Sequence, residues 1–147
     1  MWKEIVNEND ISLFMDEICG FHDSCIKEIR YVSGAYVKDN LSMHPINDKR
    51  ILSVIIQRQF EDMPVIELQF SGLKYLKMHP LTEKYTCEIF DSVMFCKDDC
   101  IYWCDSGDVT EDDSDEYEGT LICATKLRWR SVENKLGEDD FYIENSL

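Results

Sequence analysis

Glycine and proline are scarce in this chain, and long apolar runs are missing. Its 147 residues include 6 glycines and 3 prolines. No Gly-rich loop can therefore cradle a phosphate, and no P-loop, G-x-G-x-x-G or G-x-S-x-G motif occurs. No apolar run approaches the ~20 residues of a membrane-spanning helix. Residues 1–8 contain no signal-peptide core, so we expect a cytoplasmic protein with reduced thiols.

Spacings typical of metal sites are missing as well. The 7 cysteines include no C-x-x-C pair, and the 3 histidines show no H-x-x-x-H spacing, whereas structural zinc needs four ligands with short spacings. Cys96, Cys100 and Cys104 repeat every four residues, but the polar turn 97–99 predicts a hairpin in which Cys96 and Cys100 can face each other. We expect these thiols to be packing residues, with no metal and no cofactor.

Basic residues are outnumbered two to one. Thirty acids against 15 Lys and Arg give a net charge of −15, with a pI near 4.4. This charge repels nucleic-acid phosphates and anionic membranes, so we expect neither as a partner. A basic protein or a cation is the natural electrostatic partner, although acidity can also serve solubility alone. The length fits a single domain, 1–147.

The N-terminal segment has helical periodicity. Ile11, Phe14, Met15 and Ile18 follow the i, i+3, i+4, i+7 pattern of one apolar face. We expect Asn9 or Asp10 to cap this helix and Gly20 to follow its end. A further apolar group could extend the same face toward the N-terminus: Trp2, Ile5 and Val6.

Strand patterns dominate the rest of the chain. The expected strands are 24–33, 51–60, 65–70, 73–78, 85–96, 100–104 and 120–131. In 65–70, Ile66, Leu68 and Phe70 alternate with polar residues, as in an antiparallel sheet with one wet face. Short links predict hairpins for 51–70 and 85–104. The fold class is therefore α+β, mainly an antiparallel sheet, curled or folded as a sandwich, with an N-terminal helix.

Face assignments follow from the period of two. In 24–33 we expect Ile29 and Tyr31 on one face, with Ile26 and Val32 on the other. In the last strand we expect one apolar face: Leu121, Cys123, Leu127 and Trp129.

Segment 105–118 contains eight acids and no base. Dense like charges repel, which predicts a solvated, mobile loop, and the loop is our candidate surface for a basic partner. Calcium is a weaker alternative, because the EF-hand order is absent. The candidate partner-binding residues are Asp108, Glu111, Asp112, Asp113, Asp115 and Glu116. Residues 132–147 form a polar C-terminal tail with a short apolar patch, 141–143.

A basic stripe crosses the last strand. Lys126, Arg128 and Arg130 share one face around Trp129, where they can bind an anion or pair with carboxylates on a neighbouring strand. A ligand or anion site would draw on these four together with Trp103 and His22. The triplet 22–24, His-Asp-Ser, has the residue types of a hydrolase triad, but neighbouring residues of a strand face opposite ways, so we expect local backbone hydrogen bonds there.

Four short motifs carry a resemblance: F-H-D-S at 21–24, I-x-L-x-F-x-G at 66–72, F-D-S at 90–92 and K-x-R-W-R at 126–130. In this layout the chain resembles small uncharacterised bacterial proteins, some grouped with immunity proteins of polymorphic toxin systems. The resemblance covers most of the chain. It implies a cytoplasmic protein that neutralises a cognate toxin, with no catalytic residues to carry over.

The first expectation is thus a non-enzymatic, acidic protein-binding module, in particular an immunity-type inhibitor of a basic toxin. A small-ligand-binding protein or enzyme is one alternative. A structural subunit that associates with itself through an apolar sheet face is the other, and the oligomeric state is open.

Overall fold

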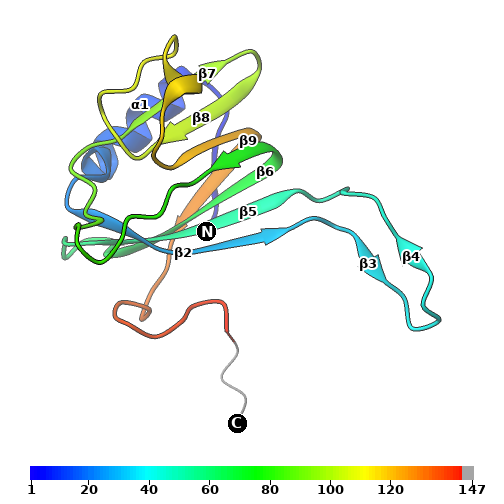
Figure 1. Cartoon of the computed structure of the whole chain (residues 1–147). Coiled ribbons are helices and arrows are strands. Elements are labelled where there is room, and N and C mark those ends of the chain that lie inside the picture. The colour runs from blue at the N-terminus through cyan, green and yellow to red at the C-terminus, as the bar shows by residue number, and fades with distance from the viewer. Residues whose placement is uncertain (144–147) are drawn as a thin grey trace.

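The computed structural model describes residues 1–143 and shows one helix lying over an antiparallel sheet (Figure 1). The expected α+β class is confirmed, and the seven main strands belong to one sheet in the order β2-β5-β6-β9-β8-β7, with β1 also beside β9. No helix among the described residues has the length and apolar character needed to span a membrane. The elements are β1 (Lys3–Ile5), α1 (Glu8–Glu17), η1 (Cys19–Phe21), β2 (Ser24–Val32), β3 (Tyr36–Val37), β4 (Met43–His44), β5 (Ile51–Arg58), β6 (Val65–Lys77), β7 (Val93–Lys97), β8 (Cys100–Cys104), η2 (Ser114–Glu116) and β9 (Leu121–Ser131).

Helix α1 begins earlier than the sequence pattern predicts. Asn7, rather than Asn9 or Asp10, is its N-cap, and the Asn7 side chain accepts a hydrogen bond from the Asp10 N–H at 2.9 Å. Gly20 follows the helix with a φ of 61°, as expected. The apolar face, including Ile11 and Phe14, lies on the sheet.

The residues before α1 form a strand, so the expected helical extension is wrong. In β1, Lys3 and Ile5 pair with Trp129 and Leu127 of β9. Strand β8 pairs with the other half of β9, Leu121–Ala124. β1 and β8 therefore lie one after the other along the same edge of β9, and neither pairs with Thr125 or Lys126.

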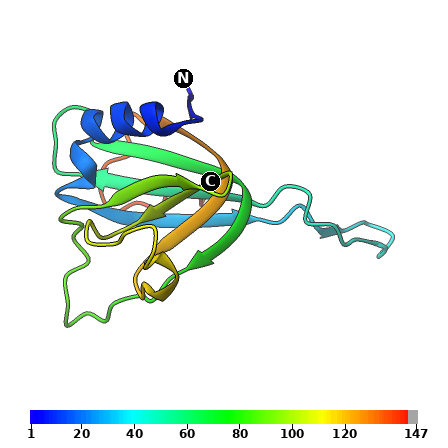
Figure 2. The same cartoon turned by 90° about the horizontal axis from the view of Figure 1, so that it is seen from above.

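The sheet bends sharply partway along the antiparallel pair of β6 and β9, visible as the strong curve of β6 in Figure 2. Gly72 has a φ of 61°, and a Cβ there would lie 2.1 Å from the Thr125 Oγ1. Only glycine fits this close approach. The register of β6 with β9 also shifts between Leu73 and Tyr75, which is the mark of a β-bulge.

This bend corrects the face predicted for β9. Thr125 and Lys126 are consecutive, yet both are exposed, so the alternation slips by one residue. As a result Ile122 and Ala124 join Leu127 and Trp129 in the core, whereas Leu121 lies in a second, smaller cluster with Cys104 and Val109. A bulge in β2 between Ile26 and Glu28 likewise places Ile26 and Ile29 on the same face, against the prediction.

Aromatic rings fill the space between α1 and the sheet. The Phe14 ring meets the Phe21 ring edge to face at 5.8 Å and the Trp129 ring at 4.7 Å. The Phe21 ring also lies 5.2 Å from the ring of Trp103, and Trp103 is fully buried. These contacts join the helix, η1 and the adjacent strands β8 and β9 into one core.

Two further predictions about β7 and β8 are settled by the pairing. The strand expected over 85–96 forms only from Val93; before it, Ile89 makes a single bridge to Ser24 and Phe90 is 67% exposed. The hairpin of β7 and β8 is confirmed, but Cys96 pairs with Ile101, so the two cysteines do not face each other directly.

Between β2 and β5, residues 33–50 form a projecting hairpin that we call the arm. It contains the short pair β3 and β4 and extends away from the rest of the molecule (Figures 1 and 2). The sequence places this segment between two expected strands, 24–33 and 51–60, but gives no sign of the projection.

Residues 132–143 run along the sheet face opposite α1 (Figure 1). The Tyr142 hydroxyl donates to Glu67 Oε2 at 3.0 Å, and the backbone N–H groups of Phe141 and Tyr142 donate to the Glu28 carboxylate. The side-chain amide of Gln57 donates to two backbone carbonyls of the tail. The polar tail therefore has an anchored course over the sheet; its last four residues, 144–147, lie outside the described part.

Candidate functional site

Segment 105–118, the acidic loop, connects β8 to β9 and is anchored at both ends. The Asp105 Oδ1 accepts hydrogen bonds from the Tyr117 hydroxyl and, at 3.1 Å, from the Thr120 N–H. Val109 and Tyr117 pack against the small cluster that contains Cys104. Burial, followed by the bond to Asp105, raises the pKa of Tyr117. The loop thus folds back on the sheet instead of extending into solvent.

A second set of bonds shapes the middle of the loop. Thr110 donates to Asp113 Oδ1 from its N–H at 2.6 Å and from its hydroxyl at 2.8 Å. These two bonds hold the pKa of Asp113 below its ordinary value. The next residues form η2, where Ser114 is 1% exposed.

Two lysines from neighbouring strands bind the loop without neutralising it. Lys77 donates to the Asp115 carbonyl at 2.8 Å and Lys97 donates to the Glu111 carbonyl at 3.1 Å. Both bonds go to backbone oxygens. Within residues 1–143, no salt bridge involves a carboxylate of this loop. The six candidate acids are all exposed: Asp108, Glu111, Asp112, Asp113, Asp115 and Glu116.

The basic stripe lies on the sheet face opposite α1, where its arginines already have partners. Arg130 donates to Glu67 Oε1 from Nε at 3.0 Å, and Arg128 donates to Gln69 Oε1 at 2.7 Å. The Trp2 ring lies 4.3 Å from the Arg128 Cζ and 4.5 Å from the Arg130 Cζ. These contacts engage the Nε donors of both arginines and a planar face of each guanidinium, which an anion or a base could otherwise bind.

The six residues suggested for a ligand or anion site do not come together. Trp103 and Trp129 are buried in the core on the helix side, whereas Arg128 and Arg130 face the opposite side. Lys126 is exposed at the edge of β9. The phase of a strand separates neighbouring residues onto two faces, so sequence proximity brings no convergence here.

His22 lies apart from the rest, after η1. Its Nδ1 lies 2.6 Å from the Phe90 carbonyl oxygen, and this bond, with the Asp23 carboxylate, raises the pKa of His22. The Ser24 hydroxyl donates to the His22 carbonyl at 3.3 Å and not to its ring. Ser24 thus makes the local backbone bond that the sequence predicts, whereas the Asp23 carboxylate lies 3.4 Å from the His22 Nε2. The triplet lacks the hydrogen bond between serine and imidazole that a triad requires.

None of the four cysteines whose thiol pKa is changed by the fold is an activated nucleophile. Burial raises the pKa values of Cys25, Cys96 and Cys123, and it raises the pKa of Cys104 to about 12. A thiol with a raised pKa stays protonated at neutral pH and is a poor nucleophile. Among the described residues, no group of three or more His, Cys, Asp or Glu is arranged to hold a metal ion.

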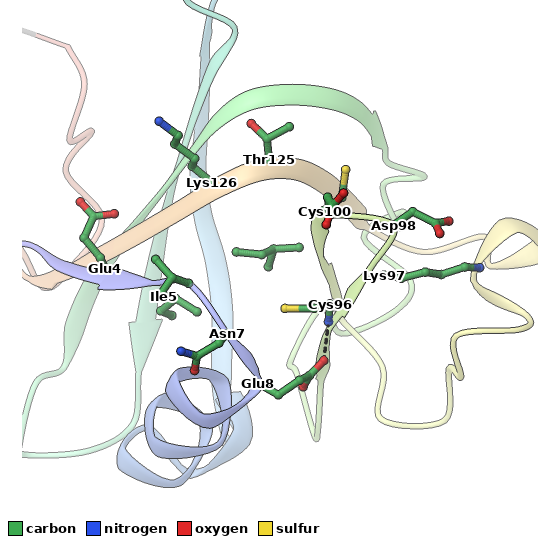
Figure 3. Close-up of a pocket in the computed structure, with 13 residues that line it drawn as sticks. Glu4, Ile5, Asn7, Glu8, Cys96, Lys97, Asp98, Cys100, Thr125 and Lys126 are labelled. Carbon is green, nitrogen blue, oxygen red and sulfur yellow. Dashed lines mark hydrogen bonds between the residues drawn. The ribbon is translucent and has the colours of Figure 1, made fainter.

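A groove of about 900 Å³ opens where β1 and β8 separate along β9 (Figure 3). Its apolar lining includes Ile5, Val6 and Ile101, and four carboxylates and two lysines also line it. The Glu8 carboxylate accepts a hydrogen bond from the Cys96 N–H at 2.8 Å, which ties the start of α1 to β7 across the groove. The charged residues that line the groove are Glu4, Glu8, Asp98, Asp99, Lys97 and Lys126.

Comparisons of the chain with protein-family models, with curated proteins and with solved structures gave no match.

Several residues that shape these surfaces were not singled out from the sequence. Asp105 and Tyr117 anchor the acidic loop, and Lys97 joins the loop to the groove. A single aromatic residue within an acidic run, Tyr117, is the signal that could have indicated an anchored loop. The groove has no such signal, because its two sides come from β1 and from the β7–β8 hairpin, which are distant in the sequence.

Proposed function

We propose that this chain is a non-enzymatic protein-binding module that engages a basic protein through the acidic loop. In the form that agrees best with the resemblance, it is a cytoplasmic immunity-type inhibitor whose partner is a basic toxin.

The observation that carries this proposal is the set of exposed carboxylates on an anchored loop. Their charge is not neutralised by any ion pair within residues 1–143, although Lys77 and Lys97 are close enough to bind the loop backbone. An anionic surface held in place accelerates encounter with a cationic partner and repels phosphates. Anchoring through Tyr117 also reduces the entropy that the loop would lose on binding.

Two observations favour binding over catalysis. The candidate polar groups of the sheet do not converge, and the resolved thiol pKa values all shift toward the unreactive form. A toxin that acts on nucleic acid must carry positive charge to bind phosphates, so an acidic protein can cover that surface.

The test compares two variants with equal net charge. The loop variant is D108N/E111Q/D112N/D115N/E116Q, which keeps Asp113 because Asp113 bonds to Thr110. The control variant neutralises five exposed acids elsewhere: D16N/E61Q/D62N/E83Q/E133Q. Each changes the net charge from −15 to −10 (−15 + 5).

Immobilised wild type and both variants are exposed to extract of the native host at low and at high salt. We expect a basic protein bound by wild type and control at low salt, released by high salt, and lost from the loop variant. With the purified partner, the association rate should fall on the order of tenfold for the loop variant alone. Equal losses for both variants, or no basic protein at low salt, would overturn the proposal.

Inhibition is tested separately from binding. When a toxic basic partner is co-expressed with wild type or control, cells should grow, and with the loop variant they should not. Binding without protection would remove the inhibitor role and leave the binding role intact.

A further inference from the structure

The arm, residues 33–50, exposes apolar side chains to an unusual degree. It is a two-stranded hairpin, and such hairpins are marginal in water without further packing. Its large exposed side chains, with their exposed fractions, are Tyr36 57%, Val37 56%, Leu41 84%, Met43 64% and Ile46 57%. Scattered exposed apolar residues are normal, but five on one projecting element indicate a contact surface.

The tip of the arm is the most telling part. Leu41 lies in the turn, where its N–H donates to the Lys38 carbonyl at 2.8 Å. Its φ is 70°, a left-handed conformation that glycine or asparagine adopts at lower cost. A leucine at this position therefore costs free energy in two ways, through its left-handed backbone and through its exposed apolar side chain. Such a costly residue indicates that the side chain contacts another surface.

The charge of the arm limits its partner. Lys38, Lys49 and Arg50 against Asp39 and Asp48 give +1, so the rest of the chain carries −16 (−15 − 1). The arm thus has the opposite sign to the acidic loop, and the basic partner proposed for the loop does not suit it. An acidic surface with an apolar floor does.

The groove between β1 and β8 is such a surface. Its four carboxylates exceed its two lysines, so its net charge is −2 (−4 + 2), and its volume of about 900 Å³ admits a hairpin tip. Val6, on its wall, is 71% exposed. The arm points away from its own body in both views (Figures 1 and 2), so the groove it meets belongs to another molecule.

We propose that the arm of one copy of this chain docks in the groove of a second copy, with Leu41 entering between β1 and the β7–β8 turn. The contact joins two different surfaces, and none of the six candidate acids of the loop lines the groove. It does not depend on the proposed function, since it uses other residues and another partner.

The first test is the mass of the protein in solution. Sedimentation at physiological ionic strength, where the Debye length is about 8 Å and repulsion between the bodies is screened, should show association of wild type that rises with concentration. Leu41→Asn keeps a residue that tolerates the left-handed turn, so the fold should persist while the dissociation constant rises about tenfold or more, as expected for losing one buried leucine. Leu41→Met should restore association.

Two controls separate the arm from exposed apolar residues in general. Leu81 is 59% exposed on the segment between β6 and β7, and Leu81→Asn should leave association unchanged. Unfolding curves of Leu41→Asn and wild type should coincide when both are monomeric, which excludes a defect in folding.

The groove is tested by mixing. Val6→Arg fills the groove without changing the bond from the Val6 N–H to Asp10 Oδ2, and it should block association on its own. The Val6→Arg variant keeps an intact arm, and the Leu41→Asn variant keeps an intact groove. When the two variants are mixed, they should therefore form a one-to-one complex. Wild type that is monomeric throughout, Leu41→Asn that still associates, or Val6→Arg that still associates would each overturn the proposal; the last result would point to arms pairing with each other.

Discussion

The acidic loop and the arm both connect strands of the sheet, but they expose side chains of opposite kinds to solvent. The loop buries Val109 and packs Tyr117 against Cys104, and it presents carboxylates, which water solvates well. The arm buries little and presents leucine, methionine and isoleucine. The loop is therefore complete as a local structure, whereas the arm gains stability only when another surface covers it.

The largest expected difference between the two regions is in the free energy of unfolding, and it can be tested with one tyrosine from each region. Tyr117→Ala removes a packed ring and its bond to Asp105, so we expect a loss of about 2–4 kcal/mol in the free energy of unfolding. Tyr36 is 57% exposed and stacks on His44 within the arm, so Tyr36→Ala should change global stability by less than about 0.5 kcal/mol. Urea unfolding followed by circular dichroism measures both; equal losses would mean that the arm is part of the cooperative unit.

How far the sequence predicts the fold follows from the range of the interactions. Helix α1 and the β5–β6 and β7–β8 hairpins depend on local periodicity and short turns, and their presence is predicted correctly, although α1 begins earlier and β7 later than expected. Strand β1 has only three residues, and its partner Trp129 lies far along the chain. The slip at Thr125 depends on Gly72 in another strand. Neither the pairing of β1 with β9 nor the slip at Thr125 can be predicted from a local sequence pattern.

The same limit applies to the candidate surfaces. The acidic loop is evident from composition, and the exposure of its carboxylates follows from their charge. The six residues grouped as a ligand site have suitable side-chain types, but they do not lie together in the fold. Trp103 lies in the core, while Arg130 is paired with Glu67 on the opposite face. The arm escapes prediction because turn residues mark where a chain reverses and not how far it projects.

The anchor of the loop can be weakened more gently than by removing the ring. Tyr117→Phe loses only the hydroxyl bond to Asp105, and we expect about 1–2 kcal/mol less stability at neutral pH. The pKa of Tyr117 is raised above its ordinary value of 10.0, so its contribution is full below pH 10 and is lost as pH rises through the folded-state pKa. The difference between wild type and Tyr117→Phe should therefore shrink in unfolding curves above pH 10. A constant difference would show that Tyr117 does not titrate with folding.

A smaller effect separates the charges of the two regions. In the five-residue loop variant, repulsion among neighbouring carboxylates is relieved, so the melting temperature should rise by a few degrees at low salt and match wild type at high salt. Lys38→Gln in the arm should change the melting temperature little at either salt concentration. Calorimetry of the three proteins measures this, and a fall for the loop variant would mean that its carboxylates make stabilising bonds.

The smallest effect concerns Asp113, whose carboxylate accepts hydrogen bonds from Thr110 in the middle of the loop. Its pKa lies below the ordinary 3.8 because Thr110 donates two hydrogen bonds to it. The stability it contributes is therefore present above pH 3.8 and is lost as pH falls through its folded-state pKa. Thr110→Val removes the hydroxyl donor and keeps the N–H, so the Asp113 carboxyl titration, followed by NMR, should move part of the way back toward 3.8. An unchanged titration would assign the low pKa to the backbone N–H alone, and the loop would then owe its shape to the Tyr117 anchor rather than to bonds among its own side chains.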